Sequence, residues 1–176
     1  MFRKMRRFKQ ELSREENIGI LESNTSGVLG LIGDDEYPYT VPLSYVYDDD
    51  KIYFHSGREG HKVSAIKACD KASFCVIDKD EIMPLEYTTY FRSVIAFGRV
   101  RFSDDENETM YAIDLLARKY APEDTAENRK AAIDREYDQL AVAVMEIEHM
   151  TGKEAIELVK KEKPDDIFIA YYPFFC

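Results

Sequence analysis

The segment at positions 53–62, Tyr-Phe-His-Ser-Gly-Arg-Glu-Gly-His-Lys, gathers side chains that could bind a phosphate and move a proton. Two of the three histidines of the chain lie here, just before an apolar pattern typical of a helix. The first backbone N–H groups of a helix have no partner within it and lie at the positive end of its dipole. Lys62 would add a full positive charge, while His61 could contact the phosphate or only cap the helix. We therefore expect a site for a small molecule that carries a phosphate.

His55 is the residue of this segment whose chemistry suits catalysis. It stands near the end of an expected strand, and its imidazole titrates near neutral pH. It could donate a hydrogen bond to a bound ligand, act as a proton donor, or be a structural histidine. His149 lies close to Glu146 and Glu148, but no further ligand spacing supports a metal site, so none is predicted.

The composition is that of one ordinary globular domain over residues 1–176. We expect a core over about 12–152, followed by a C-terminal helix and an aromatic tail over 153–176. The net charge of −10 argues against nucleic acid and against an anionic membrane surface as partners, although the first nine residues include five basic ones. No apolar run is long enough to span a membrane, and no signal-peptide core is present, so a cytoplasmic protein is expected.

Apolar and β-branched runs predict a chain rich in strands. The expected strands are 27–33, 37–47, 51–56, 72–78, 88–102 and 140–150. They come in hairpins, such as the one around the acidic turn at 48–50, which favours an antiparallel barrel over a parallel doubly wound sheet. The strand at 88–102, bent near Gly98, is long for a small open sheet and common in a barrel.

Capping signals and helical spacing predict helices around this barrel. The expected helices are 12–23, 63–69, one after Ser103, 125–139 and a short one up to Lys161. Three pairs fit the capping-box pattern: Ser13 with Glu16, Ser103 with Glu106, and Thr151 with Glu154. The segment 79–86, which contains Pro84, is expected to be a loop.

Three motifs, in order, resemble the FMN-binding split-barrel family of the pyridoxamine 5′-phosphate oxidase type. The first is Gly-Val-Leu-Gly at 27–30 with Tyr-Pro-Tyr-Thr-Val-Pro-Leu-Ser-Tyr-Val at 37–46. The second, Ile-Tyr-Phe-His-Ser at 52–56 with Gly-His-Lys at 60–62, is similar to the subgroup related to nitroimidazole-resistance proteins. The third is Phe-Arg-Ser-Val-Ile-Ala-Phe-Gly-Arg-Val at 91–100. The resemblance covers about 12–152.

This resemblance implies a mainly β fold: a six-stranded antiparallel Greek-key split barrel that forms a homodimer, with FMN at the interface. Carried over residue by residue, Thr40, Val41, Pro42 and Leu43 would run along the isoalloxazine ring. His55 and Ser56 would lie beside the flavin, and His61 and Lys62 near its phosphate. Ser93 would contact the flavin, while Arg92 would pair with the phosphate or with an acidic neighbour.

The same comparison limits the activity that we expect. Arg92-Ser93 replaces the arginine-glutamine pair of the oxidases, and the chain contains no tryptophan, so oxidation of pyridoxamine phosphate is not expected. The resemblance implies a flavoprotein that takes electrons from a reduced nicotinamide and reduces a small organic substrate, nitro compounds among the candidates. The alternative is a non-catalytic binding module for FMN or a related cofactor such as haem or a deazaflavin.

Overall fold

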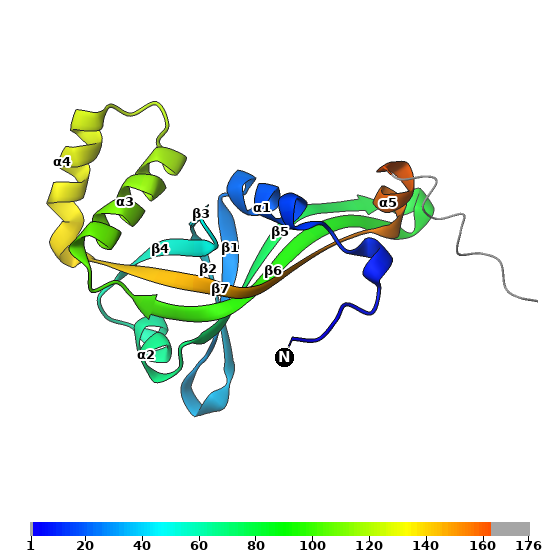
Figure 1. The fold of residues 1–176 in the computed structure, drawn as a ribbon, viewed down its shortest axis with the longest axis horizontal. Helices are drawn as coiled ribbons and strands as arrows, with labels where there is room; N and C mark the ends of the chain where they lie inside the picture. The colour runs from blue at the N-terminus through cyan, green and yellow to red at the C-terminus, as the bar shows by residue number, and fades with distance from the viewer. Residues whose placement is uncertain (1, 163–176) are drawn as a thin grey trace, which may run out of the picture.

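The computed structural model describes residues 2–162, and these form one antiparallel sheet of seven strands with helices around it (Figure 1). The strands are β1 (Ser26–Ile32), β2 (Pro38–Ser44), β3 (Val46–Asp48), β4 (Lys51–Gly57), β5 (Lys71–Met83), β6 (Thr88–Phe102) and β7 (Leu140–Glu154). Their order across the sheet is β2-β1-β5-β6-β7-β4-β3. The mainly β split-barrel prediction is confirmed, with one strand more than the six expected.

The additional strand arises because the run 37–47 does not form one strand. It divides at Tyr45 into β2, which pairs with β1, and β3, which pairs with β4. These two strands stand at opposite ends of the sheet order, yet only Tyr45 separates them in the chain. One residue can join them only if the sheet curls until its two ends come close, so the sheet forms a barrel that stays open between β2 and β3.

Tyr120 satisfies the backbone at the junction. Its hydroxyl accepts a hydrogen bond from the Tyr45 N–H at 2.8 Å and lies 3.0 Å from the Tyr45 carbonyl oxygen. The same hydroxyl also contacts the carbonyl oxygen of Thr25. The Tyr45 side chain is fully buried, and its hydroxyl donates to the carbonyl oxygen of Leu21 at 2.8 Å. Backbone groups that leave the sheet ladder at this point therefore keep partners.

β5 and β6 form a hairpin that extends beyond the barrel (Figure 1). The expected loop at 79–86 was wrong over most of its length, because β5 continues to Met83 and a single 3-10 turn, Pro84–Glu86, leads into β6. The expected bend near Gly98 is confirmed as a register shift between Phe97 and Gly98 in the pairing with β7. A Cβ at Gly98 would lie 2.0 Å from the carbonyl oxygen of Glu146, so the strands approach too closely there for a side chain.

Five α-helices surround the sheet in the described part of the chain. They are α1 (Arg14–Ser23), α2 (His61–Ala68), α3 (Glu106–Tyr120), α4 (Ala126–Glu136) and α5 (Ile156–Glu162). The capping box of α1 is confirmed, since Ser13 and Glu16 each bond the backbone N–H of the other. The other two predicted boxes were wrong. Asp105 caps α3, and Thr151 and Glu154 lie within β7.

Three apolar clusters are buried among the described residues, and the two larger ones divide most of the interior. The larger one fills the barrel and includes the fully buried Phe54 and Phe74. The second lies between the outer face of β4 and β7 and the helices α3 and α4, where Tyr53, Ile113 and Ile133 meet. Alternation along β4 explains the division, because successive side chains of a strand point to opposite faces. The expected aromatic tail beyond residue 162 lies outside the described residues.

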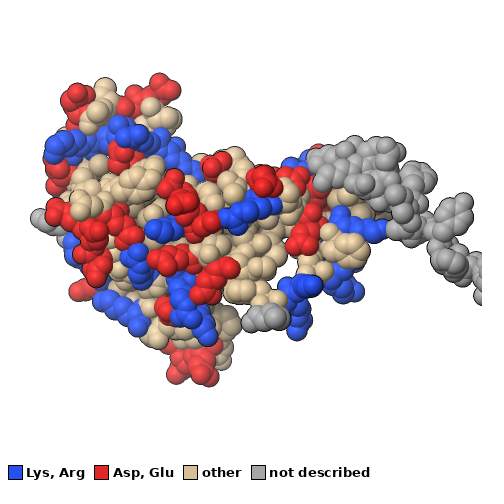
Figure 2. All heavy atoms as spheres, in the orientation of Figure 1, with Lys and Arg blue, Asp and Glu red and all other residues tan. Residues whose placement is uncertain are grey.

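The face of the molecule drawn in Figure 2 has no continuous basic patch. Acidic and basic side chains are interspersed over the face drawn in Figure 2. Among residues 2–162, no helix combines the length and apolar character that crossing a membrane requires.

Candidate functional site

β2 presents an open edge of the sheet to a ligand. It pairs with β1 on one side and stands last in the strand order on the other. Thr40 and Pro42 are exposed, whereas Val41 and Leu43 are half-buried and pack on the barrel core. The backbone groups on the outer edge of such a strand are available to a partner other than a strand. The four expected ring contacts therefore divide into two outward side chains and two core side chains.

His55 and Ser56 point to opposite faces of β4. Ser56 is buried and follows the alternation of Ile52 and Phe54, so its side chain faces the barrel interior. His55 is exposed and lies on the outer face, beside α3 and α4. Of these two expected flavin neighbours, only His55 faces solvent in the single chain, and contact of either with a flavin stays a prediction.

The start of α2 has the features of an anion site. Its N-cap residue, Gly60, adopts a φ of +117°, which a residue with a side chain would adopt only under strain. No side chain caps the helix, so its first N–H groups are left for solvent or a ligand. His61 turns toward the β1–β2 hairpin instead: its ring stacks on Tyr39 at 4.1 Å, and its Nε2 lies 3.6 Å from Asp34.

Lys62 is half-buried and has no ion-pair or hydrogen-bond partner among the described residues. Its ammonium nitrogen lies 5.7 Å from the centre of the Phe54 ring, a weak cation–π contact. Burial lowers the pKa of Lys62, because removing water penalises the charged form. A partly desolvated cation beside an uncapped helix start is the arrangement that a phosphate would neutralise.

Arg92 and Ser93 lie away from this cluster. Ser93 pairs with Lys153 of β7, whereas β4 pairs with β7 only up to Glu146. Seven residues of strand separate these positions, which is roughly 23 Å. Of the two alternatives for Arg92, the structure shows the acidic neighbour: its Nη2 lies 2.8 Å from the carboxylate of the buried Glu154. Arg92 and Ser93 therefore lie at a different part of the sheet from the end of β4 that leads to Lys62.

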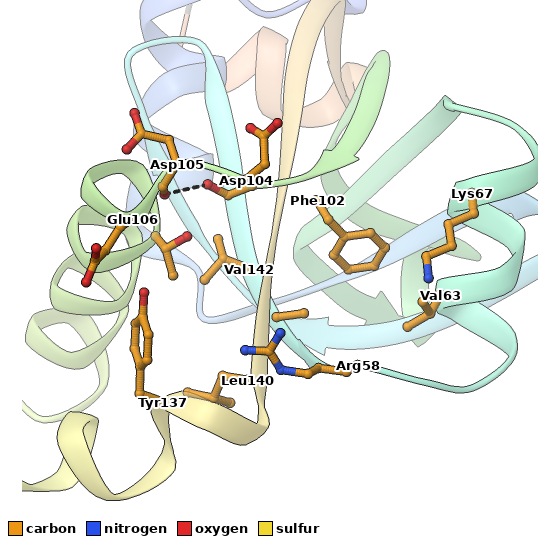
Figure 3. A pocket seen from close by; sticks show the side chains of 13 residues that line it. Arg58, Val63, Lys67, Phe102, Asp104, Asp105, Glu106, Tyr137, Leu140 and Val142 are labelled. Carbon is orange, nitrogen blue, oxygen red and sulfur yellow. Dashed lines mark hydrogen bonds between the residues drawn. The ribbon is translucent and has the colours of Figure 1, made fainter.

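A cavity of about 570 Å³ lies between α2, the end of β6 and the start of α3. Figure 3 shows Arg58 and Lys67 toward one side of it and acidic residues toward the other: Asp104, Asp105 and Glu106. This mixture of charges does not favour a phosphate.

A second cavity, of about 380 Å³, lies between β4, α3 and α4. Its walls are mostly apolar, and His55 and Ser44 line it on the barrel side. The sequence predicted His55 as a site residue but did not predict that α3 and α4 lie opposite it. Ala117 and Tyr120 of α3 line the opposite wall of this cavity. His149 is not part of either cavity, since its ring stacks on Phe2 at 4.6 Å.

The curled antiparallel sheet of β1–β7, with β2 and β3 at its two ends, is that of the split-barrel class of protein. The chain belongs to the pyridoxamine 5′-phosphate oxidase family, whose model matches residues 13–154. A comparison with curated protein sequences gave no match.

Solved structures of similar fold include flavin-binding proteins. A candidate 5-nitroimidazole antibiotic resistance protein from Bacteroides thetaiotaomicron is 22% identical with a TM-score of 0.68, over 82% of this chain and 86% of that one. An FAD-binding protein from Mesorhizobium loti is 25% identical with a TM-score of 0.58, over 82% and 94% of the two chains. A flavocytochrome from Azotobacter vinelandii is 18% identical with a TM-score of 0.69, over 86% and 72%.

Proposed function

We propose that this protein binds FMN and reduces a small organic substrate, with nitroaromatic and nitroimidazole compounds as the first candidates. The observation that carries the proposal is Lys62, a half-buried cation with no ion-pair or hydrogen-bond partner among residues 2–162, at an uncapped helix start. The family and its flavin-binding structural neighbours support a flavin as the phosphate-bearing molecule.

The residues present fit such a group. Lys62 and the first N–H groups of α2 would hold the phosphate, and the outer edge of β2 at Thr40 and Pro42 would border the ring. When bound, FMN supplies the ability to accept a hydride from a reduced nicotinamide and to pass two electrons on. The chain itself would position the ring and leave one face open.

His55 is the residue we assign to proton transfer. A nitro group that gains two electrons and two protons loses one oxygen as water and becomes a nitroso group, while the nicotinamide is oxidised. His55 is exposed and lines the cavity that a substrate could enter, so it could deliver one of these protons. Substitution by alanine should therefore lower turnover and largely spare FMN affinity.

We also propose that the protein acts as a homodimer with the flavin at the interface. Large apolar side chains are exposed along the β5–β6 hairpin: Ile77, Ile82, Leu85, Tyr87, Ile95 and Phe97. Covering them with a second copy would remove water from an unfavourable surface. In such a dimer, the partner subunit's Ser93 could contact the flavin that this chain holds at Lys62.

The experiment begins with the colour and the ligand of the purified protein. We expect a yellow protein that releases FMN rather than FAD, as identified by mass spectrometry. Anaerobic mixing with a reduced nicotinamide should bleach the flavin, and a nitroimidazole should restore the colour. A colourless preparation that takes up no added FMN would contradict flavin binding. A bound flavin that stays inert would instead support the binding module, for which haem and a deazaflavin are the other ligands to test.

Sedimentation tests the dimer separately. We expect two chains per particle at micromolar concentration, and Leu85→Asp should shift the equilibrium toward the monomer because Leu85 is almost fully exposed in the single chain. A wild-type monomer that retains FMN would overturn the interface model.

A further inference from the structure

We propose that the cavity between β4, α3 and α4 binds the organic substrate and selects a small apolar molecule that carries a protonated amine. Its use as a substrate site rests on the proposed function, whereas the binding of such a molecule does not. The cavity, about 380 Å³, is near the lower end of the range for small-molecule pockets.

The walls suit the apolar part of a ligand. Ile113 and Leu116 come from α3, Ile133 from α4, and Leu140 from the start of β7. Three of these belong to the buried cluster that holds the helices against the barrel, so they are fixed in place without a ligand. A preformed apolar wall binds a ring or short chain without the cost of ordering the site.

The charged groups of the cavity favour a cation. Two carboxylates line it, those of Asp124 and Glu136, together with one guanidinium, that of Arg129. Arg129 is mostly buried, and its Nε lies 3.1 Å from the carboxylate of Asp114, which offsets its charge and also pairs with the exposed Arg118. Glu136 pairs with Arg135 at 3.2 Å, but both side chains are exposed, so water screens that pair. The Asp124 carboxylate also accepts a hydrogen bond from the Thr125 N–H at 2.9 Å, which holds it in position. Among the residues that line the cavity, two are acidic and one is basic, so a protonated amine is favoured there and a carboxylate is disfavoured.

The position of the cavity connects it to the flavin site. Ser44, which ends β2, and His55 of β4 both line it on the barrel side. Thr40 and Pro42, the proposed ring neighbours, lie four and two residues before Ser44 and alternate to the same outward face. A molecule in the cavity would therefore lie beside His55 and next to the end of the edge strand that borders the ring.

Three nitroaromatic probes of the same shape but different charge test this selection. They are 4-nitrobenzylamine, 4-nitrobenzyl alcohol and 4-nitrobenzoate, titrated calorimetrically into FMN-loaded and FMN-free protein. We expect the amine to bind about fivefold more tightly than the alcohol and at least about tenfold more tightly than the carboxylate, with the difference shrinking in high salt. Equal binding of the three probes, or binding of none, would overturn the proposal.

Variants place the binding in this cavity. Ala132 is half-buried on the α4 wall, and Ala132→Phe should fill the space and abolish binding. Ala117→Leu on the α3 wall gives the same test if the first variant folds poorly. Glu136→Gln should remove most of the preference for the amine, whereas Glu127→Gln, exposed on α4 outside the cavity lining, should leave it intact. Retained binding in a folded cavity-filling variant would contradict the assignment.

The two proposals fail separately. If the protein takes up no flavin but FMN-free protein prefers the amine, the flavoenzyme proposal fails and the cavity stands as a binding site. If FMN binds and is reduced but the probes show no preference, the selection by this cavity is wrong and the flavin site is unaffected.

Discussion

The ammonium nitrogen of Lys62 lies 5.7 Å from the centre of the Phe54 ring, and Phe54 is fully buried in the barrel core. The charge therefore stands over the end of the apolar interior and has lost part of its water. A cation–π contact offsets part of that loss, and a bound anion would offset more. We therefore expect Lys62 to lower the stability of the ligand-free protein and to raise its affinity for an anion.

Lys62→Met should separate these two effects. We expect FMN affinity to fall at least about tenfold, because a charge-assisted hydrogen bond contributes roughly 1.5–3 kcal/mol. The stability of the flavin-free protein should stay the same or rise, because the methionine needs no water. Fluorescence titration with FMN and thermal unfolding measure the two quantities. Lys67→Met, an exposed lysine on the same helix, is the control, and an equal loss of affinity in both variants would contradict the assignment.

Glu154→Gln should destabilise the fold. Glu154 is only 5% exposed, and its carboxylate lies 2.8 Å from Nη2 of Arg92, which is itself mostly buried. Loss of the negative charge weakens a mostly buried ion pair, which we expect to lower the free energy of unfolding by about 2–4 kcal/mol. Chemical denaturation measures the change. Glu148→Gln removes the exposed ion pair with Arg99 and should cost less than about 1 kcal/mol; similar losses for both would argue against burial as the cause.

Two glycine substitutions should have opposite effects. Gly98→Ala places a Cβ against the carbonyl oxygen of Glu146, which cannot move without shifting β7, so we expect a loss of more than about 2 kcal/mol. Gly19→Ala lies in an exposed position of α1 with no atom within 4 Å of the new Cβ. It should stabilise the protein by about 0.5–1 kcal/mol through helix propensity. Thermal unfolding measures both changes. An unchanged stability in Gly98→Ala would mean that the strands can move apart at the register shift beside Gly98.

Alkaline pH should unfold the protein through its buried tyrosines. Burial raises the pKa of Tyr53 to about 12 and also raises the pKa values of Tyr45 and Tyr47. These phenols keep their protons in the folded state above about pH 10, where the unfolded chain loses them. Their contribution to stability is complete below about pH 10 and is lost as the pH rises from there through the raised pKa values of the folded state.

Denaturant titrations at a series of pH values, followed by tyrosinate absorbance, test this dependence. The free energy of unfolding should decline from about pH 10 upward, and Tyr53→Phe should decline less steeply because one of these protons is absent. The lowered pKa of Lys62 acts in the opposite direction, since the unfolded chain binds that proton more strongly just below its ordinary pKa. A decline as steep in Tyr53→Phe as in the wild type would show that Tyr53 does not contribute.

Local sequence patterns predicted most of the helices and strands but not how these elements join. The capping box at Ser13 and the bend at Gly98 followed from residues close in sequence, and the structure confirms both. The break at Tyr45 was missed, because Tyr-Val-Tyr suits a strand on both sides of it. What divides the strand there is a distant residue, Tyr120, which bonds the Tyr45 backbone from the end of α3.

The sequence by itself determined the β-rich fold and the family, and it predicted a phosphate site at the segment that ends in Lys62, since these depend on residue types and spacing along the chain. Only the tertiary structure decided which of the expected site residues meet. Strand alternation turns His55 outward and Ser56 inward, and the length of β6 carries Ser93 away from Lys62. The cavity beside His55 exists because α3 and α4, some sixty residues further along the chain, fold back onto β4. Contacts between segments so far apart depend on the path of the whole chain, and no local pattern encodes them.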